Sequence, residues 1–114
     1  MQLITDDQRA KMLATGERMA RDDAHDPLPV LRLFMPDGSC SWRLAALDPD
    51  YPNLAFGLVD RGGRLPEFAI MRLSEMSGLR DSRGQPVERD LGFAADRPIG
   101  AYAASAAMLG RHAP

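Results

Sequence analysis

Residues 30 to 48 read VLRLFMPDGSCSWRLAALD, and this stretch decides the fold. Its first part, VLRLFM (30–35), places alternate side chains on opposite faces, which predicts a strand. PDGS (36–39) combines Pro, Asp and Gly, which are residues typical of a turn. CSWRLAALD (40–48) then alternates again, with Trp42 and Leu44 on one face. The stretch therefore predicts two antiparallel strands joined by a short turn.

The same pattern continues toward the C-terminus. LAFGLVD (54–60) predicts a third strand, RGGR (61–64) a glycine turn, and LPEFAIMRL (65–73) a fourth strand. Pro66 suits the first residues of that strand, because proline cannot donate a hydrogen bond to a neighbouring strand. PVERDLGF (86–93) is a candidate fifth strand. Successive strands with short connections predict an antiparallel meander.

A helix is predicted on each side of these strands. Thr5 and Gln8 form a capping box for a helix over residues 6–21, whose apolar residues recur at helical spacing. Ser74 favours a single helical turn, and Asp96 is expected to cap a C-terminal helix that contains Pro98 near its start. We predict one α+β domain over residues 1–114: a single antiparallel sheet of four to five strands with an N-terminal and a C-terminal helix packed against it.

Composition narrows the class of function. The 114 residues carry a net charge of −2, with a pI of about 5.6, which disfavours binding to nucleic acid through phosphate neutralisation. Cys40 is the only cysteine, so neither an internal disulfide nor a thiolate zinc site is expected. The first residues, MQLITDDQRAKM, lack the charge and apolar run of a signal peptide, and no apolar stretch is long enough to cross a membrane. We predict a cytoplasmic protein.

Several motifs resemble those of a known family. These are Phe34 and Pro36, Trp42, the FGLVD stretch (56–60), LSEM (73–76) and PVERDL (86–91). In this order they are similar to the domain-of-unknown-function 2958 family, small proteins of plasmids, integrated elements and phages. The resemblance covers most of the chain, and PVERDL is its most specific part. It implies a mobile-element setting and no particular activity.

The segment 87–93 places three charges between apolar residues. As a strand it would put Val87, Arg89, Leu91 and Phe93 on one face and Glu88 and Asp90 on the other. We expect a buried Arg89 that pairs with a carboxylate, the candidates being Glu75, Asp60 and Asp81. One alternative is that the segment is an exposed edge whose charges bind a protein partner. Another is a Mg²⁺- or Mn²⁺-dependent hydrolase in which Glu88 and Asp90 hold the metal.

Trp42 is the single tryptophan. We expect it in the core, where one large aromatic side chain can fill a small domain. The alternative is a stacking platform for single-stranded nucleic acid, with phosphate contacts from four arginines: Arg43, Arg61, Arg64 and Arg72.

No nucleophile–base pair, metal constellation or cofactor loop stands out in the sequence, so we expect no catalytic residues, no metal and no cofactor. The favoured function is a non-enzymatic protein of a mobile element that binds an unidentified protein, either against host defence or in maintenance of the element. The candidate binding residues are Trp42, Glu75, Glu88, Arg89 and Asp90. The Ala-rich stretch AYAASAAML (101–109) could pack on the sheet or on a second copy of the chain.

Overall fold

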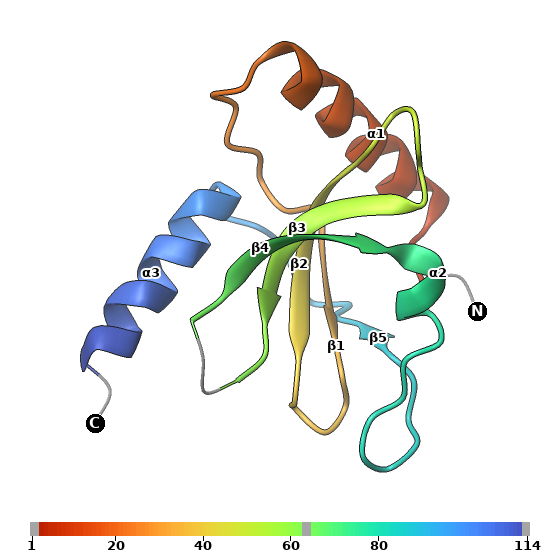
Figure 1. The fold of residues 1–114 in the computed structure, drawn as a ribbon, viewed down its shortest axis with the longest axis vertical. Helices are drawn as coiled ribbons and strands as arrows, with labels where there is room; N and C mark the ends of the chain where they lie inside the picture. The colour runs from red at the N-terminus through yellow and green to blue at the C-terminus, as the bar shows by residue number, and fades with distance from the viewer. Residues whose placement is uncertain (1–2, 63–64, 113–114) are drawn as a thin grey trace.

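The structure is a five-stranded antiparallel sheet with helices packed against it, as the sequence predicts (Figure 1). The computed structural model describes residues 3–62 and 65–112. The strands follow the order β4-β3-β2-β1-β5 across the sheet, so β1 to β4 form a meander and β5 joins the other side of β1. The elements are α1 (Asp6–Arg21), β1 (Leu31–Phe34), β2 (Ser41–Leu47), β3 (Leu54–Asp60), β4 (Glu67–Arg72), α2 (Leu73–Met76), β5 (Glu88–Arg89) and α3 (Ile99–His112).

The strand register divides the side chains between two faces. Leu33, Trp42 and Val59 lie opposite one another on the face that we call the inner face. The main core forms there, and it also includes Met12 of α1, Leu73 and Met76 of α2, and Val87. Arg43, Leu58 and Phe68 lie in the neighbouring row on the opposite face, which we call the outer face.

Helix α1 lies across the sheet and has the bounds that the sequence predicts (Figure 1). Thr5 Oγ1 accepts a hydrogen bond from the Gln8 N–H at 3.1 Å, and Gln8 Oε1 accepts one from the Thr5 N–H at 2.9 Å. Met12 and Gly16 are its two buried residues. A Cβ atom on Gly16 would overlap the carbonyl oxygen of Leu47, so a glycine at this position lets α1 lie directly against the end of β2.

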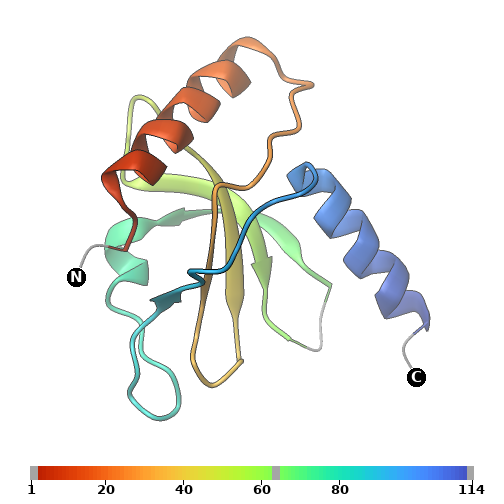
Figure 2. The ribbon, with the colours of Figure 1, turned by 180° about the vertical axis from the view of Figure 1, so that it is seen from behind.

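The outer face is covered only in part. The chain between β5 and α3 passes across it, as Figure 2 shows from behind, and Ile99 at the start of α3 packs on Ala45 and Leu58. Ala45 is the extra residue where the register shifts between Leu44 and Ala46, and it is fully buried. Beyond its first turns, α3 extends away from the sheet in both views.

The expected cap of α3 is corrected by the structure. Asp96 accepts hydrogen bonds from the side chains of Arg97 and Tyr102, which together lower its pKa to about 2, with Arg97 as the larger cause. The N-terminus of α3 is capped instead by Asp26, whose Oδ1 accepts a hydrogen bond from the Gly100 N–H at 2.9 Å. Asp26 precedes Gly100 by 74 residues, so local sequence rules could not find this cap.

Helix α2 also starts differently from the prediction. It begins at Leu73, its N-cap residue is Arg72, and no side chain caps it. Ser74 instead bonds to the loop before β3: its N–H donates to Asn53 Oδ1 at 3.0 Å, and its hydroxyl oxygen accepts from Asn53 Nδ2 at 2.9 Å. These bonds hold the end of β4 against the start of β3.

Candidate functional site

The charged segment after Val87 is a strand for only two residues. Glu88 lies opposite Phe34 and Arg89 opposite Leu33, so the predicted alternation of these two side chains is confirmed. After Arg89 the chain turns, because the Gly92 N–H donates to Asp90 Oδ1 at 3.1 Å and the Phe93 N–H donates to the Asp90 carbonyl. Leu91 is consequently 90% exposed, and the predicted continuation of a buried face through Leu91 is wrong.

The predicted ion pair of Arg89 is also wrong. Among the residues that the structure describes, Arg89 forms no salt bridge and is only half-buried. The arginine that pairs within this region is Arg32 of β1, whose Nη1 lies 3.2 Å from Asp90 Oδ2. The Asp90 N–H also donates to the Arg32 carbonyl at 2.9 Å, so the two residues fix the end of β5 to β1. An ion pair does hold this segment, but it joins Arg32 to Asp90 and does not include Arg89.

The three carboxylates predicted as binding residues differ in their partners and in their exposure. Glu75 pairs with Arg72 at 3.3 Å on the surface, Glu88 is exposed on β5, and Asp90 is engaged by Arg32. Within residues 3–62 and 65–112, the structure contains no group of three His, Cys, Asp or Glu side chains that could hold a metal ion. In the described chain, Glu88 and Asp90 therefore have no third His, Cys, Asp or Glu ligand grouped with them.

Trp42 lies in the main core and is 7% exposed. It belongs to the same buried cluster as Met12 of α1 and Leu33, so in this structure no base could stack on it. The arginines proposed beside it are also engaged: Arg61 lies 3.7 Å from Glu67, and Arg72 pairs with Glu75. Arg64 lies outside the described residues.

Arg43 lies under α3 on the outer face. Its guanidinium carbon is 4.7 Å from the centroid of the Tyr102 ring, and that of Arg97 is 5.2 Å from the same ring. Arg43 lies directly opposite Arg32 in the strand register. Contact with an aromatic ring stabilises a guanidinium group with no carboxylate partner. Arg43 is thus half-buried against α3, whereas a phosphate-binding arginine would be free in solvent.

Cys40 has the properties of a structural cysteine. It is half-buried against the main core, and burial raises the pKa of its thiol. A raised pKa keeps the thiol protonated at neutral pH, and the protonated form is a poor nucleophile.

The feature that sequence reasoning missed is an apolar surface at β4. Phe68 is 50% exposed and Ile70 is 71% exposed, and Phe68 stacks on Phe56 of β3 with ring centroids 5.7 Å apart. Exposed aromatic and branched side chains gathered in this way are typical of interaction sites.

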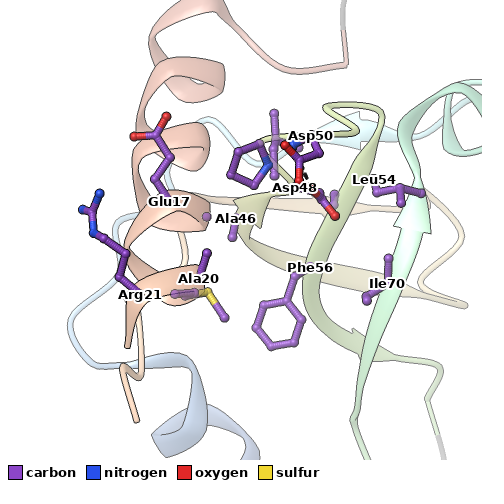
Figure 3. A pocket seen from close by; sticks show the side chains of 14 residues that line it. Glu17, Ala20, Arg21, Ala46, Asp48, Asp50, Leu54, Phe56 and Ile70 are labelled. Carbon is purple, nitrogen blue, oxygen red and sulfur yellow. Dashed lines mark hydrogen bonds between the residues drawn. The ribbon is translucent and has the colours of Figure 1, made fainter. Parts of the chain in front are cut away.

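A groove of about 610 Å³ adjoins this surface, between the C-terminal half of α1 and the start of β3 (Figure 3). Ala20 and Arg21 of α1 lie on one side and Leu54 and Ile70 on the other, with Phe56 between them. The rim carries four charged residues: Glu17, Arg21, Asp48 and Asp50. The groove and the apolar side chains of β4 share Ile70, so they form one continuous surface.

The comparison with protein families agrees with the fold and the motifs. A family described as "Protein of unknown function (DUF2958)" matches residues 3–112. The chain belongs to the DUF2958 family. No curated protein and no solved structure matches the chain.

The DUF2958 match includes α1, the whole sheet and α3, so the groove and the edge of β4 both lie inside the family domain. The family description names no function for the DUF2958 domain. None of the helices in the described part of the chain is long and apolar enough to span a membrane.

One signal in the sequence could have pointed to this surface. LPEFAIMR is apolar on both faces, with Phe68 and Ile70 on one and Ala69 and Met71 on the other. A strand with two apolar faces suggests burial on both sides. Only the tertiary structure shows that β4 is an edge strand and that Phe68 and Ile70 on its outer face are exposed.

Proposed function

We propose that this protein is a non-enzymatic interaction domain that binds another protein through β4 and the adjoining groove. The observation that carries the proposal is the exposure of Phe68 and Ile70 on an edge strand, directly beside an apolar groove. Single exposed apolar side chains are common on protein surfaces, but a cluster continuous with a groove is typical of a binding site.

The setting is part of the same proposal. We place the protein in the cytoplasm and in a mobile genetic element, with a partner from the host defence or from the maintenance machinery of the element. The motif resemblance, above all the PVERDL stretch at residues 86–91, supports the mobile element, and the single cysteine, Cys40, is consistent with a reducing cytoplasm. Glu88 and Asp90, which were predicted as binding residues, lie in or next to β5 at the opposite edge of the sheet from β4, so they are not part of this surface.

The proposal is tested by affinity capture from a lysate of the organism that carries the gene, using the tagged protein, with mass spectrometry as the readout. The test variant is Ile70→Asp, which places a charge at the centre of the proposed site. The control is Leu91→Asp, because Leu91 is 90% exposed but lies on the turn after β5. Both variants are first compared with the wild type by circular dichroism and thermal melting.

We expect one protein to be retained by the wild type and by Leu91→Asp and to be lost with Ile70→Asp, with and without nuclease treatment. Equal retention by both variants would place the binding site elsewhere. Loss of the partner on nuclease treatment would support a nucleic-acid-mediated interaction instead, because such a partner is held through the nucleic acid.

A further inference from the structure

The free edge of β4 shows how a partner could bind. The Leu73 N–H donates to the Asn53 carbonyl at 2.9 Å, so Leu73 and Asn53 form a hydrogen-bonded pair. Hydrogen-bonded and non-hydrogen-bonded pairs alternate along an antiparallel ladder. Residues 67, 69 and 71 therefore bond to β3, while the backbone N–H and C=O groups of Phe68 and Ile70 and the N–H group of Arg72 point away from it. The C=O group of Arg72, the N-cap residue of α2, accepts the first bond of that helix.

No strand of the sheet lies beyond β4 in the described chain, so these backbone groups form an open row. Natural proteins commonly protect such a row with charges, prolines or a covering loop. Here the only charged residues of β4 are Glu67 and Arg72 at its ends, and the side chains between them are Phe68, Ala69, Ile70 and Met71. The middle of the edge is thus open and apolar, as expected of a strand that accepts another strand.

We propose that β4 binds an extended segment of the partner protein as a sixth strand of the sheet. This inference rests on the proposed function and specifies how the partner binds. The segment would form backbone hydrogen bonds with Phe68, Ile70 and the N–H of Arg72 and place alternate apolar side chains beside those of Phe68 and Ile70 on the outer face. Neighbouring strands lie about 4.8 Å apart, so a long side chain on this face can reach over Ile70 to the groove.

The charges of the rim indicate the chemistry of the segment. Three carboxylates, Glu17, Asp48 and Asp50, lie around the groove against one arginine, Arg21. Neither Glu17 nor Asp50 forms a salt bridge with any described residue. Because exposed charges act over about 8 Å at physiological salt, this rim favours a segment with a basic residue at the end that lies beside the groove.

A second copy of the chain fits this site less well. Its β4 would cover the edge but would bring no basic residue to the rim, since the only arginine of that strand, Arg72, pairs with Glu75. A strand pair alone is also a small interface compared with the roughly 800 Å² per partner of a stable complex. A segment that also fills the groove comes closer to that area.

The probe for this inference is a phage-displayed library of random linear dodecapeptides, selected against the intact protein. We expect enrichment of peptides with apolar residues at alternate positions and a Lys or Arg toward one end. The consensus peptide is then synthesised with a fluorescent label, and its affinity is measured by fluorescence anisotropy. N-methylation of every second backbone amide should weaken binding at least tenfold in one frame and have little effect in the other, because only one set of amides faces β4.

Variants of the protein give an independent readout. Ile70→Pro removes one outward N–H group and leaves every bond to β3 intact, which an edge strand tolerates. We expect it to weaken binding at least tenfold, and Glu17→Lys to weaken it several-fold in a salt-dependent manner. The control Leu91→Pro should bind the peptide as the wild type does.

Three results would overturn the inference: no enriched peptide, a consensus with helical spacing of its apolar residues, or equal binding in both N-methylation frames. A fourth is a dimer of the free protein in sedimentation experiments that Ile70→Pro dissociates, because the occupant of the edge would then be a second copy. If peptides fail to bind while lysate capture still depends on Ile70, the proposed function stands, and the partner binds through a folded surface.

Discussion

Replacing Gly16 by alanine should destabilise the protein, although alanine is the better helix former. In an exposed helix interior, glycine is about 1 kcal/mol less favourable than alanine. At Gly16, however, a Cβ atom would overlap the carbonyl oxygen of Leu47 and lie 3.3 Å from Cδ of Pro49. The overlapping atom belongs to the backbone of β2, so it cannot rotate away, and α1 has to move off the sheet.

The expected magnitude follows from these opposing effects. Forcing extra atoms into a packed site costs about 1–3 kcal/mol, and a clash with a backbone atom belongs at or above the upper end of this range. Subtracting about 1 kcal/mol for the gain in helix propensity leaves a net loss of about 2 kcal/mol in the free energy of unfolding. For a urea dependence of 1–3 kcal/mol per M, the midpoint of unfolding should fall by about 1 M.

The assay is urea unfolding followed by circular dichroism, with Ala14→Gly as the reciprocal control. Ala14 is exposed on the same helix, so its replacement should cost about 1 kcal/mol through helix propensity alone. Both substitutions are expected to destabilise the protein, although one replaces glycine by alanine and the other replaces alanine by glycine. A Gly16→Ala variant more stable than the wild type would refute the close contact between α1 and β2.

Three further predictions concern charged groups. Arg89→Ala should change the free energy of unfolding by less than about 0.5 kcal/mol. Arg32→Ala should lower it by up to about 1 kcal/mol, because the ion pair between Arg32 and Asp90 is partly exposed and therefore weak. If urea unfolding showed a larger loss for Arg89→Ala than for Arg32→Ala, the assignment of Arg32 as the partner of Asp90 would be contradicted. Asp26→Ala should cost about 1 kcal/mol and speed hydrogen exchange of the first turn of α3, whereas Asp96→Ala should leave the Gly100 amide protected. Hydrogen bonds from the side chain and backbone of Ser39, and then from Ser82, hold the pKa of Asp37 below its ordinary value of 3.8. The ionised Asp37 carboxylate therefore stabilises the fold above pH 3.8, and this contribution is lost as the pH falls further. Asp37→Asn should consequently lose less stability than the wild type between pH 5 and 2. Equal losses in the two proteins would count against a stabilising role of the Asp37 carboxylate.

The fold was predictable because most of its elements are specified by short-range patterns. Thr5 and Gln8 determine the start of α1 within one turn, and the turn residues after Met35 determine the first hairpin. Strand alternation also predicted that Trp42 would share a face with Leu44, and both lie in the main core. These features depend on neighbours a few residues apart, whose geometry the sequence shows directly.

The candidate site was not predictable in the same way. The segment around Arg89 attracted attention because charges stand between apolar residues, but the guanidinium group that pairs with Asp90 comes from Arg32, 58 residues earlier. The exposed positions at Phe68 and Ile70 looked like core positions, because an apolar strand has the same sequence pattern in the middle of a sheet as at its edge.

The sequence alone determined the class of this protein, its helices and hairpins, and its membership of the DUF2958 family. The tertiary structure decided which strand became the edge, which arginine met Asp90, and that Asp26 capped α3. The physical reason is that secondary structure follows from local torsional and hydrogen-bond preferences. The exposure of a side chain and the partners of a charge depend instead on how distant segments pack, and in this protein that packing leaves β4 and its groove open.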